Sequence, residues 1–175
     1  MLFRSKKIAA LSISKGTLST SAVNTDPLIS YEIYSDNLYG LTAAGIVKVT
    51  DAALGHTSIT TWLTDPIAAT PALITVDGNV LVLSSNGVLT TYYKGKKKNE
   101  ANTAIAPEVS SLFLTNTDSP NLYLINPGTG RIYVIAKASG TVTKTLKTNA
   151  KITSAALASD DTVYLLSDNK IWKVQ

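Results

Sequence analysis

A lysine cluster is the first group of side chains in this chain that could do chemistry. Lys94-Gly95-Lys96-Lys97-Lys98 follows Tyr92 and Tyr93. Clustered lysines attract phosphate backbones, acidic lipid headgroups and acidic proteins, and a neighbouring tyrosine can stack on a base. The reading that we favour is a solvated turn whose charges keep an outer strand from pairing with another chain. Lys94, Lys96, Lys97 and Lys98 are the candidate residues for an anionic contact.

A second group, Asp26, Asp65 and Asn149, recurs at corresponding junctions of a repeat described below. If these junctions share one face of the molecule, the three side chains could converge on a cation or a polar ligand. Capping of the turns by the Asp and Asn side chains themselves explains the residues equally simply, and we favour it.

The histidine His56 lies in the polar stretch 51–57 and would need a nucleophile and an orienting carboxylate to act as a general base. The chain has no cysteine and one histidine, which leaves no set of soft ligands for a metal. We also find no phosphate-binding glycine loop and no nucleophile elbow. The sequence therefore predicts no cofactor, no metal site and no enzymatic activity.

The elements that position these residues form a repeat. Short apolar strands begin at Asn37, Asn79, Asn121 and Thr162, at spacings of 42, 42 and 41 residues. Each strand follows a turn, and each is one of several short strands in its unit. A period of roughly 40–50 residues with about four strands per unit is typical of β-propeller blades. The predicted fold is an all-β propeller of four-stranded antiparallel blades, with about four blades in the chain.

The repeat divides the single domain 1–175 into blades. We expect a partial blade over 5–26, full blades over 27–65, 66–106 and 107–148, and a last blade over 149–175 that lacks its outermost strand. Within the second full blade, residues 87–93 predict the third strand, and the fourth is expected near 102–106. The N-terminal strands 7–13 and 17–21 match the third and fourth strands of a blade.

This division into blades leaves three ways to complete the propeller ring. The N-terminal fourth strand could fill the gap in the last blade by strand exchange, which removes an unpaired edge. Two chains could instead share one ring of about eight blades as a homodimer through their open ends. The chain could also be the C-terminal part of a longer propeller.

The segment 122–134 carries a family resemblance. Asn126-Pro-Gly-Thr-Gly-Arg131 resembles the NHL and YVTN class of β-propeller repeat, in which a strand ends in Asp, a Gly-Asn turn follows and Arg-Ile opens the next strand. Here Asn126 replaces the acid and Thr129 replaces the Asn. The resemblance implies the propeller fold and a structural role for Arg131, through a hydrogen bond across the turn between the second and third strands. Propellers of this class bind proteins, RNA or small ligands, and a few are enzymes.

Composition narrows the range of partners. The net charge is +4, from 16 basic and 12 acidic residues, and the only arginines are Arg4 and Arg131. Because readers of nucleic acid use arginine for bidentate contacts, this balance argues against nucleic-acid binding. We find no apolar run long enough for a transmembrane segment, and the N-terminus makes a poor signal peptide.

We therefore expect a non-catalytic propeller that binds a protein partner as an interaction or scaffolding module. Two alternatives stay open. One is binding of an anionic polymer or membrane surface through the lysine cluster. The other is a small-ligand or enzymatic site at the central channel.

Overall fold

The computed structural model describes residues 7–12, 17–22, 26–50, 58–63, 67 and 70–174. Every regular element among those residues is a β-strand, and each sheet consists of strands that are consecutive in the chain and antiparallel. This confirms the predicted all-β class with four-stranded antiparallel blades.

The sheets follow one another along the chain. A hairpin of β1 (Lys7–Ser12) and β2 (Thr17–Ala22) comes first. Blade one contains β3 (Ser30–Tyr34), β4 (Asn37–Leu41), β5 (Ile46–Thr50) and β6 (Ser58–Thr61). Blade two contains β7 (Pro71–Val76), β8 (Val80–Ser84), β9 (Val88–Tyr93) and β10 (Lys96–Asn102). Blade three contains β11 (Leu112–Leu114), β12 (Asn121–Asn126), β13 (Arg131–Ala136) and β14 (Val142–Lys147). Blade four contains β15 (Ile152–Leu157), β16 (Val163–Ser167) and β17 (Lys170–Lys173).

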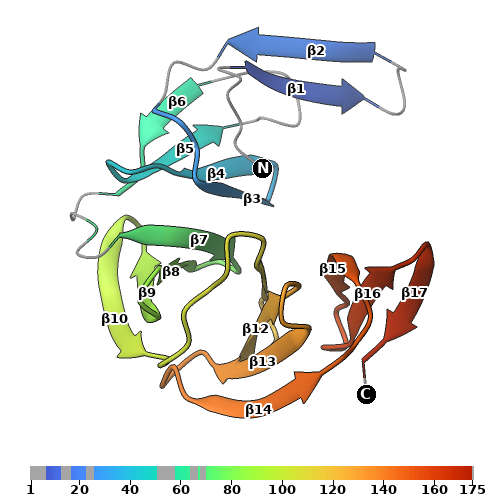
Figure 1. The fold of residues 1–175 in the computed structure, drawn as a ribbon. Coiled ribbons are helices and arrows are strands. Elements are labelled where there is room, and N and C mark those ends of the chain that lie inside the picture. Colours follow the sequence, from blue (N-terminus) through green and yellow to red (C-terminus); the bar gives the residue numbers. More distant parts are fainter. Residues whose placement is uncertain are drawn as a thin grey trace.

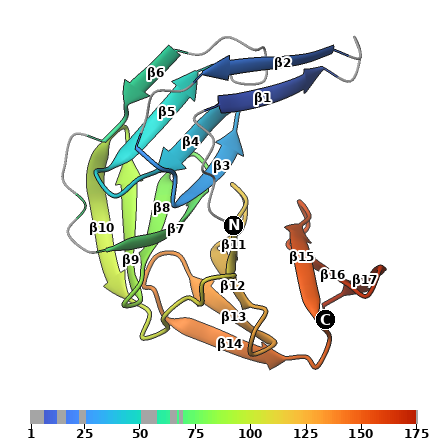
Figure 2. The ribbon, with the colours of Figure 1, turned by 45° about the horizontal axis from the view of Figure 1, so that its top comes forward.

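The four blades are arranged around a common axis (Figure 1). The first strand of each blade is the innermost, and contacts link β3 with β7, β7 with β11, and β11 with β15. Both views leave an opening between blade four and blade one (Figures 1 and 2). The array is therefore a propeller with two end faces: the face of blade one that points away from blade two, and the face of blade four that points away from blade three.

Tight turns fix the register of the hairpins. Ser35 and Asp36 both have positive φ, and so do Lys94 with Gly95 and Asp168 with Asn169. Two central residues with positive φ match the right-handed twist of the flanking strands, which makes two-residue hairpin loops. Because side chains alternate along a strand, each such turn also fixes which residues face each neighbouring blade.

The core lies between the blades. Leu41 and Ile46 of blade one pack with Ile74 and Val82 of blade two. A second cluster fills the space between blades two and three, around Leu83 and Leu124, and a third joins blade three to blade four. The strands β8 and β12 are buried almost throughout because both of their faces meet a blade.

The fourth strand of blade two differs from its expected place. It was expected near 102–106, with the lysine cluster in the preceding turn, but β10 begins at Lys96 and only Lys94 and Gly95 form the turn. The expectation was wrong because an outer edge strand with a solvated face needs no apolar alternation. All but one residue of β10 are exposed. The polar run Lys96–Asn102 can therefore form a strand by backbone pairing with β9 alone, without burying apolar side chains.

Strand exchange within the chain is not what the structure shows. The strands β1 and β2 pair with each other in a sheet of their own, and β17 is the last strand of a three-stranded sheet. Figures 1 and 2 place the hairpin on the side of blade one that faces away from blade two, far from β17. Of the three ways to complete the ring, strand exchange within the chain is therefore not the one seen, and the hairpin instead extends the array beyond blade one.

A substitution at Gly130 tests the conformation of the turn between β12 and β13, which carries the family resemblance. Its φ is +64°, and an added Cβ would overlap the backbone carbonyl oxygen of Thr148. The left-handed conformation costs a residue with a Cβ about 1–2 kcal/mol, and a clash with backbone adds to that. Gly130→Ala is expected to lower the free energy of unfolding by at least about 2 kcal/mol, measured by urea denaturation.

The matched control is Gly128→Ala in the same turn. Its added Cβ would lie 2.7 Å from Oε2 of Glu108, the end of a flexible side chain, and its φ is not positive. We expect a cost below about 1 kcal/mol, since surface changes of this kind are small. Equal costs at the two positions would contradict the described turn.

Candidate functional site

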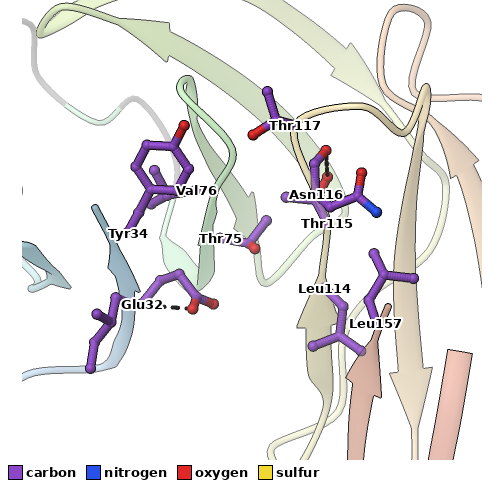
Figure 3. Close-up of a pocket in the computed structure, with 10 residues that line it drawn as sticks. Glu32, Tyr34, Thr75, Val76, Leu114, Thr115, Asn116, Thr117 and Leu157 are labelled. Carbon is purple, nitrogen blue, oxygen red and sulfur yellow. Dashed lines mark hydrogen bonds between the residues drawn. The ribbon is translucent and has the colours of Figure 1, made fainter. Parts of the chain in front are cut away.

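A cavity of about 340 Å³ lies on the axis of the array, where the inner strands of the blades end. Figure 3 shows Glu32 and Tyr34 on one side of it and Leu114, Asn116 and Leu157 on the other. The walls are mostly apolar, threonine or amide groups. The full set is Glu32, Ile33, Tyr34, Thr75, Val76, Leu114, Thr115, Asn116, Thr117 and Leu157.

Glu32 is the carboxylate of this cavity. It is half-buried, and its Oε1 accepts a hydrogen bond from the backbone N–H of Ile33 at 3.2 Å. Burial raises the pKa of Glu32 above its ordinary value, and the hydrogen bond from Ile33 opposes that rise. A carboxylate with apolar neighbours has lost hydrogen bonds to water. It therefore favours binding of a ligand with a cationic group, such as an amine, which would replace those interactions.

The raised pKa of Glu32 predicts how stability depends on pH. The folded state holds the proton more tightly than the unfolded state, so stability is highest below the unfolded pKa near 4.5 and falls as pH rises through the folded pKa. Glu32→Gln cannot ionise, and we expect it to raise the thermal midpoint at pH 7 but not well below pH 4.5. Circular dichroism melts at both pH values check this.

The control for that experiment is Glu100→Gln, which changes an exposed carboxylate on the outer strand β10. It should give no gain in thermal midpoint at pH 7. A Glu32→Gln variant with a lower midpoint at pH 7 would show that the carboxylate is stabilising in the folded chain and would contradict the expectation.

A buried ion pair lies next to the cavity. Lys137 Nζ contacts Asp77 Oδ2 and donates to the carbonyl oxygen of Asn116 at 2.6 Å. Asp77 Oδ1 accepts from the backbone N–H of Asn79 at 3.1 Å. The side chains of Asp77 and Lys137 are 4% and 17% exposed. Since Asp77 belongs to blade two and Lys137 to blade three, the ion pair links the two blades.

The lysine candidates lie on the outer edge of blade two, away from the axis. Lys96, Lys97 and Lys98 are exposed residues of β10, and Lys94 is in the turn before it. The Nζ atoms of Lys94 and Lys98 lie 5.2 and 6.0 Å from the centre of the Tyr93 ring, which is 49% exposed. Lys97 pairs with Glu100 at 2.8 Å. The lysines and Tyr93 together make a cationic, partly aromatic edge.

The structure does not bring Asp26 and Asn149, the junction candidates that it describes, to the cavity. Asp26 and Asn149 are exposed and precede the inner strands β3 and β15, whereas the cavity lies where the inner strands end. Asp65 and His56 fall outside the described residues. Ligand binding by Asp26, Asp65 and Asn149 stays a prediction.

Arg131 makes a different hydrogen bond from the expected one. Its Nη1 donates to the hydroxyl of Tyr133 on its own strand at 3.5 Å, not across the turn between β12 and β13. Residues two apart on a strand share a face, which explains the pairing. Asn126, at the family's acidic position, is buried and its Oδ1 accepts from Ser111 Oγ at 2.6 Å.

Glu32, Asp77 and Lys137 were not identified from the sequence. The sequence feature that could have identified Glu32 is its position: it is an acidic residue inside the innermost strand Ser30–Tyr34, in which burial alternates along the strand. Asp77 stands next to Gly78, a pair that predicts a hairpin turn, and the sequence gives no reason to pair it with a lysine sixty residues later.

The described part of the chain contains no cluster of three or more His, Cys, Asp or Glu side chains that could hold a metal ion. None of the described segments is a helix long and apolar enough to cross a membrane.

Comparison with known proteins gives structural matches alone. No family model matches the chain, and no curated protein sequence matches it. Among solved structures, BamB from Moraxella catarrhalis superposes with a TM-score of 0.59 at 13% identity, over 99% of this chain and 52% of that one. A streptogramin B lyase superposes with a TM-score of 0.61 at 16% identity, over 98% and 62%. BBS1N, solved in complex with ARL6DN, superposes with a TM-score of 0.61 at 13% identity, over 97% and 57%.

The chain thus spans between about half and two thirds of the length of these structures. At such identities the likeness shows the fold and not the activity. BamB and the streptogramin B lyase are both β-propeller proteins. This chain has the β-propeller fold, and its resemblance to NHL-type repeats agrees with these matches.

Proposed function

We propose that this chain is a non-catalytic β-propeller module that binds a protein partner through an end face of its blade array. The observation that carries the proposal is the uncovered apolar face of blade four. Leu166 and Ile171 lie directly opposite each other on β16 and β17, and they are 38% and 75% exposed. Contiguous exposed apolar side chains mark interaction surfaces on soluble domains.

The equivalent face of blade three is covered by the next blade. Ile125 of blade three and Leu166 of blade four hold the same position in their second strands, four residues after Asn121 and Thr162. Ile125 is completely buried in the cluster that joins blade three to blade four. Leu166 has no such cover. The partner that fits is therefore one that presents an apolar sheet face of its own.

The compared structures and the cavity support a binding role. BBS1N was solved in complex with another protein, ARL6DN. Among the described residues that line the cavity, Glu32 and Tyr34 are the ones with ionisable side chains, and the others are apolar, threonine or amide groups. The streptogramin B lyase shares the fold at 16% identity, and fold does not carry its chemistry to this chain.

Photo-crosslinking from position 171 tests the proposal. A photoreactive amino acid replaces Ile171, and the same substitution at Thr145 on the exposed face of β14 is the control. We expect a discrete protein adduct from position 171 and none from position 145 in cells that express the chain. Equal adducts at both positions, or none at either, would contradict a protein-binding role for this face.

The cationic edge of blade two supports a second candidate function, binding of an anionic polymer or membrane surface. The specific observation is the grouping of Lys94 and Lys98 about the exposed ring of Tyr93. If this edge binds polyanions, changing Lys94, Lys96, Lys97 and Lys98 to alanine abolishes salt-dependent retention on heparin. The control removes the same number of charges from exposed lysines elsewhere, at Lys144, Lys147, Lys151 and Lys170. Equal loss in both variants would mean that net charge alone sets retention.

A further inference from the structure

We infer that a second copy of this chain is the partner of blade four: its blade one covers the exposed face. The inference rests on the proposed function, because it names the partner of the same end face. It follows from a comparison of the two end faces with the interfaces that the chain already makes between its own blades.

The face of blade four repeats the face that blade one turns toward blade two. In blade one, Leu41 lies opposite Ile46, and both are completely buried against blade two. In blade four, Leu166 lies opposite Ile171 at the equivalent positions of the second and third strands. The two pairs have the same register and the same apolar character, but only the pair in blade one is covered.

The opposite end of the array carries the matching face. In blade two, Ile74 and Val76 of the inner strand receive blade one, and Val76 lies opposite Val80. In blade one, Ile33 lies opposite Leu38 at the equivalent position. Tyr31 and Ile33, the equivalents of Ile74 and Val76, are 44% and 59% exposed.

One chain therefore presents the blade-four half of an interface that its internal blades make, and the part of the blade-one half that lies on the inner strand, at Tyr31 and Ile33. The halves lie at opposite ends of the array (Figure 1), so one copy must supply one half and another copy the other. Two copies related by a two-fold axis make the contact twice and close the ring.

The hairpin of β1 and β2 fits the same arrangement. It stands on the side of blade one that would receive the second copy (Figure 2). On that side Leu38 and Val49 are buried, whereas Tyr31 and Ile33 near the axis are exposed. In the described part of the chain, blade four has three strands, and no further strand pairs with the outer edge of β17. In the closed pair, the hairpin of one copy lies beside the β17 edge of the other.

Charge substitutions on the two faces test the inference in the purified chain. Ile33→Asp disables one face and Ile171→Asp disables the other, and both residues are exposed enough in the single chain to accept Asp without unfolding it. A buried, unpaired carboxylate is costly, so each variant should raise the dissociation constant of the pair by at least about 100-fold. Thr145→Asp on β14 is the control. Sedimentation equilibrium over a range of concentrations measures the mass.

Mixing the variants gives the sharper result. Either variant alone spoils both contacts of the closed pair, because each contact needs one face from each copy. In an equal mixture, blade four of the Ile33→Asp copy meets blade one of the Ile171→Asp copy, and that contact is intact. The other contact of the mixed pair carries both carboxylates. We therefore expect the mass of two copies for the wild type and the control, one copy for each variant, and a smaller dissociation constant in the mixture than for either variant alone.

Three results would overturn the inference. The wild type could have the mass of one copy at every concentration. Ile33→Asp could leave the pair intact, which would mean that blade four pairs with blade four. An open series of larger masses would show that the contact does not close. If the wild type is a single copy and position 171 still crosslinks to a different protein, the proposed function stands and only the second copy is wrong.

Discussion

Lys137→Met is expected to lower the free energy of unfolding by about 3 kcal/mol. The substitution removes the cation from a buried pair and leaves the Asp77 carboxylate without its partner, and breaking such pairs costs roughly 3–5 kcal/mol. We expect the lower end because Lys137 keeps 17% of its side chain exposed. Urea denaturation at pH 7, with the two-state slope checked, measures the loss.

The double variant Asp77→Asn with Lys137→Met separates charge from packing. Once the carboxylate is neutral no buried charge is left, and the double variant should be more stable than Lys137→Met alone. Asn keeps an acceptor for the backbone N–H of Asn79. A double variant that is less stable than Lys137→Met would contradict the role of Lys137 as the counter-charge of Asp77.

Ile125→Ala is expected to cost about 3 kcal/mol, because deleting a large, completely buried aliphatic side chain costs roughly 2–5 kcal/mol through lost burial and the cavity left behind. Leu166→Ala removes a side chain of similar size at the same repeat position. In dilute solution, where copies are apart, it should cost less than about 1 kcal/mol, since Leu166 is 38% exposed. Thermal or urea unfolding of both variants gives the comparison.

The difference between these two alanine variants reports whether blade four is covered. If the second copy binds, the cost of Leu166→Ala should grow with protein concentration, since binding of a partner to the folded state adds stability. The cost of Ile125→Ala should stay nearly constant. Equal costs for both variants in dilute solution would mean that Leu166 is already covered within one chain.

The blade architecture could be predicted from the sequence because it depends on local signals. The spacing of about 42 residues between the second strands and the turns at Ser35-Asp36 and Asp77-Gly78 reflect short-range backbone chemistry. The burial of both faces of β8 and β12 follows from their near-continuous apolar runs. The one misplaced strand, β10, is the one whose residues carry no apolar alternation.

The candidate site could not be predicted in the same way because it depends on contacts between blades. Asp77 and Lys137 are sixty residues apart, and each looks like an ordinary turn residue in its own hairpin. Glu32 gains its raised pKa from burial among other blades. The exposure of Leu166 and Ile171 likewise depends on the absence of a neighbour on one side of blade four, whereas the sequence shows only that both are apolar.

Crosslinking between engineered cysteines tests most directly whether one copy's blade four meets another copy's blade one. The natural chain has no cysteine, so Tyr31→Cys and Leu166→Cys introduce single thiols without background. A short bis-maleimide is added to each variant alone and to their mixture. The account predicts a covalent pair of Tyr31→Cys with Leu166→Cys in the mixture and little product from either variant alone. No product in the mixture, or an equal product from Leu166→Cys alone, would contradict it.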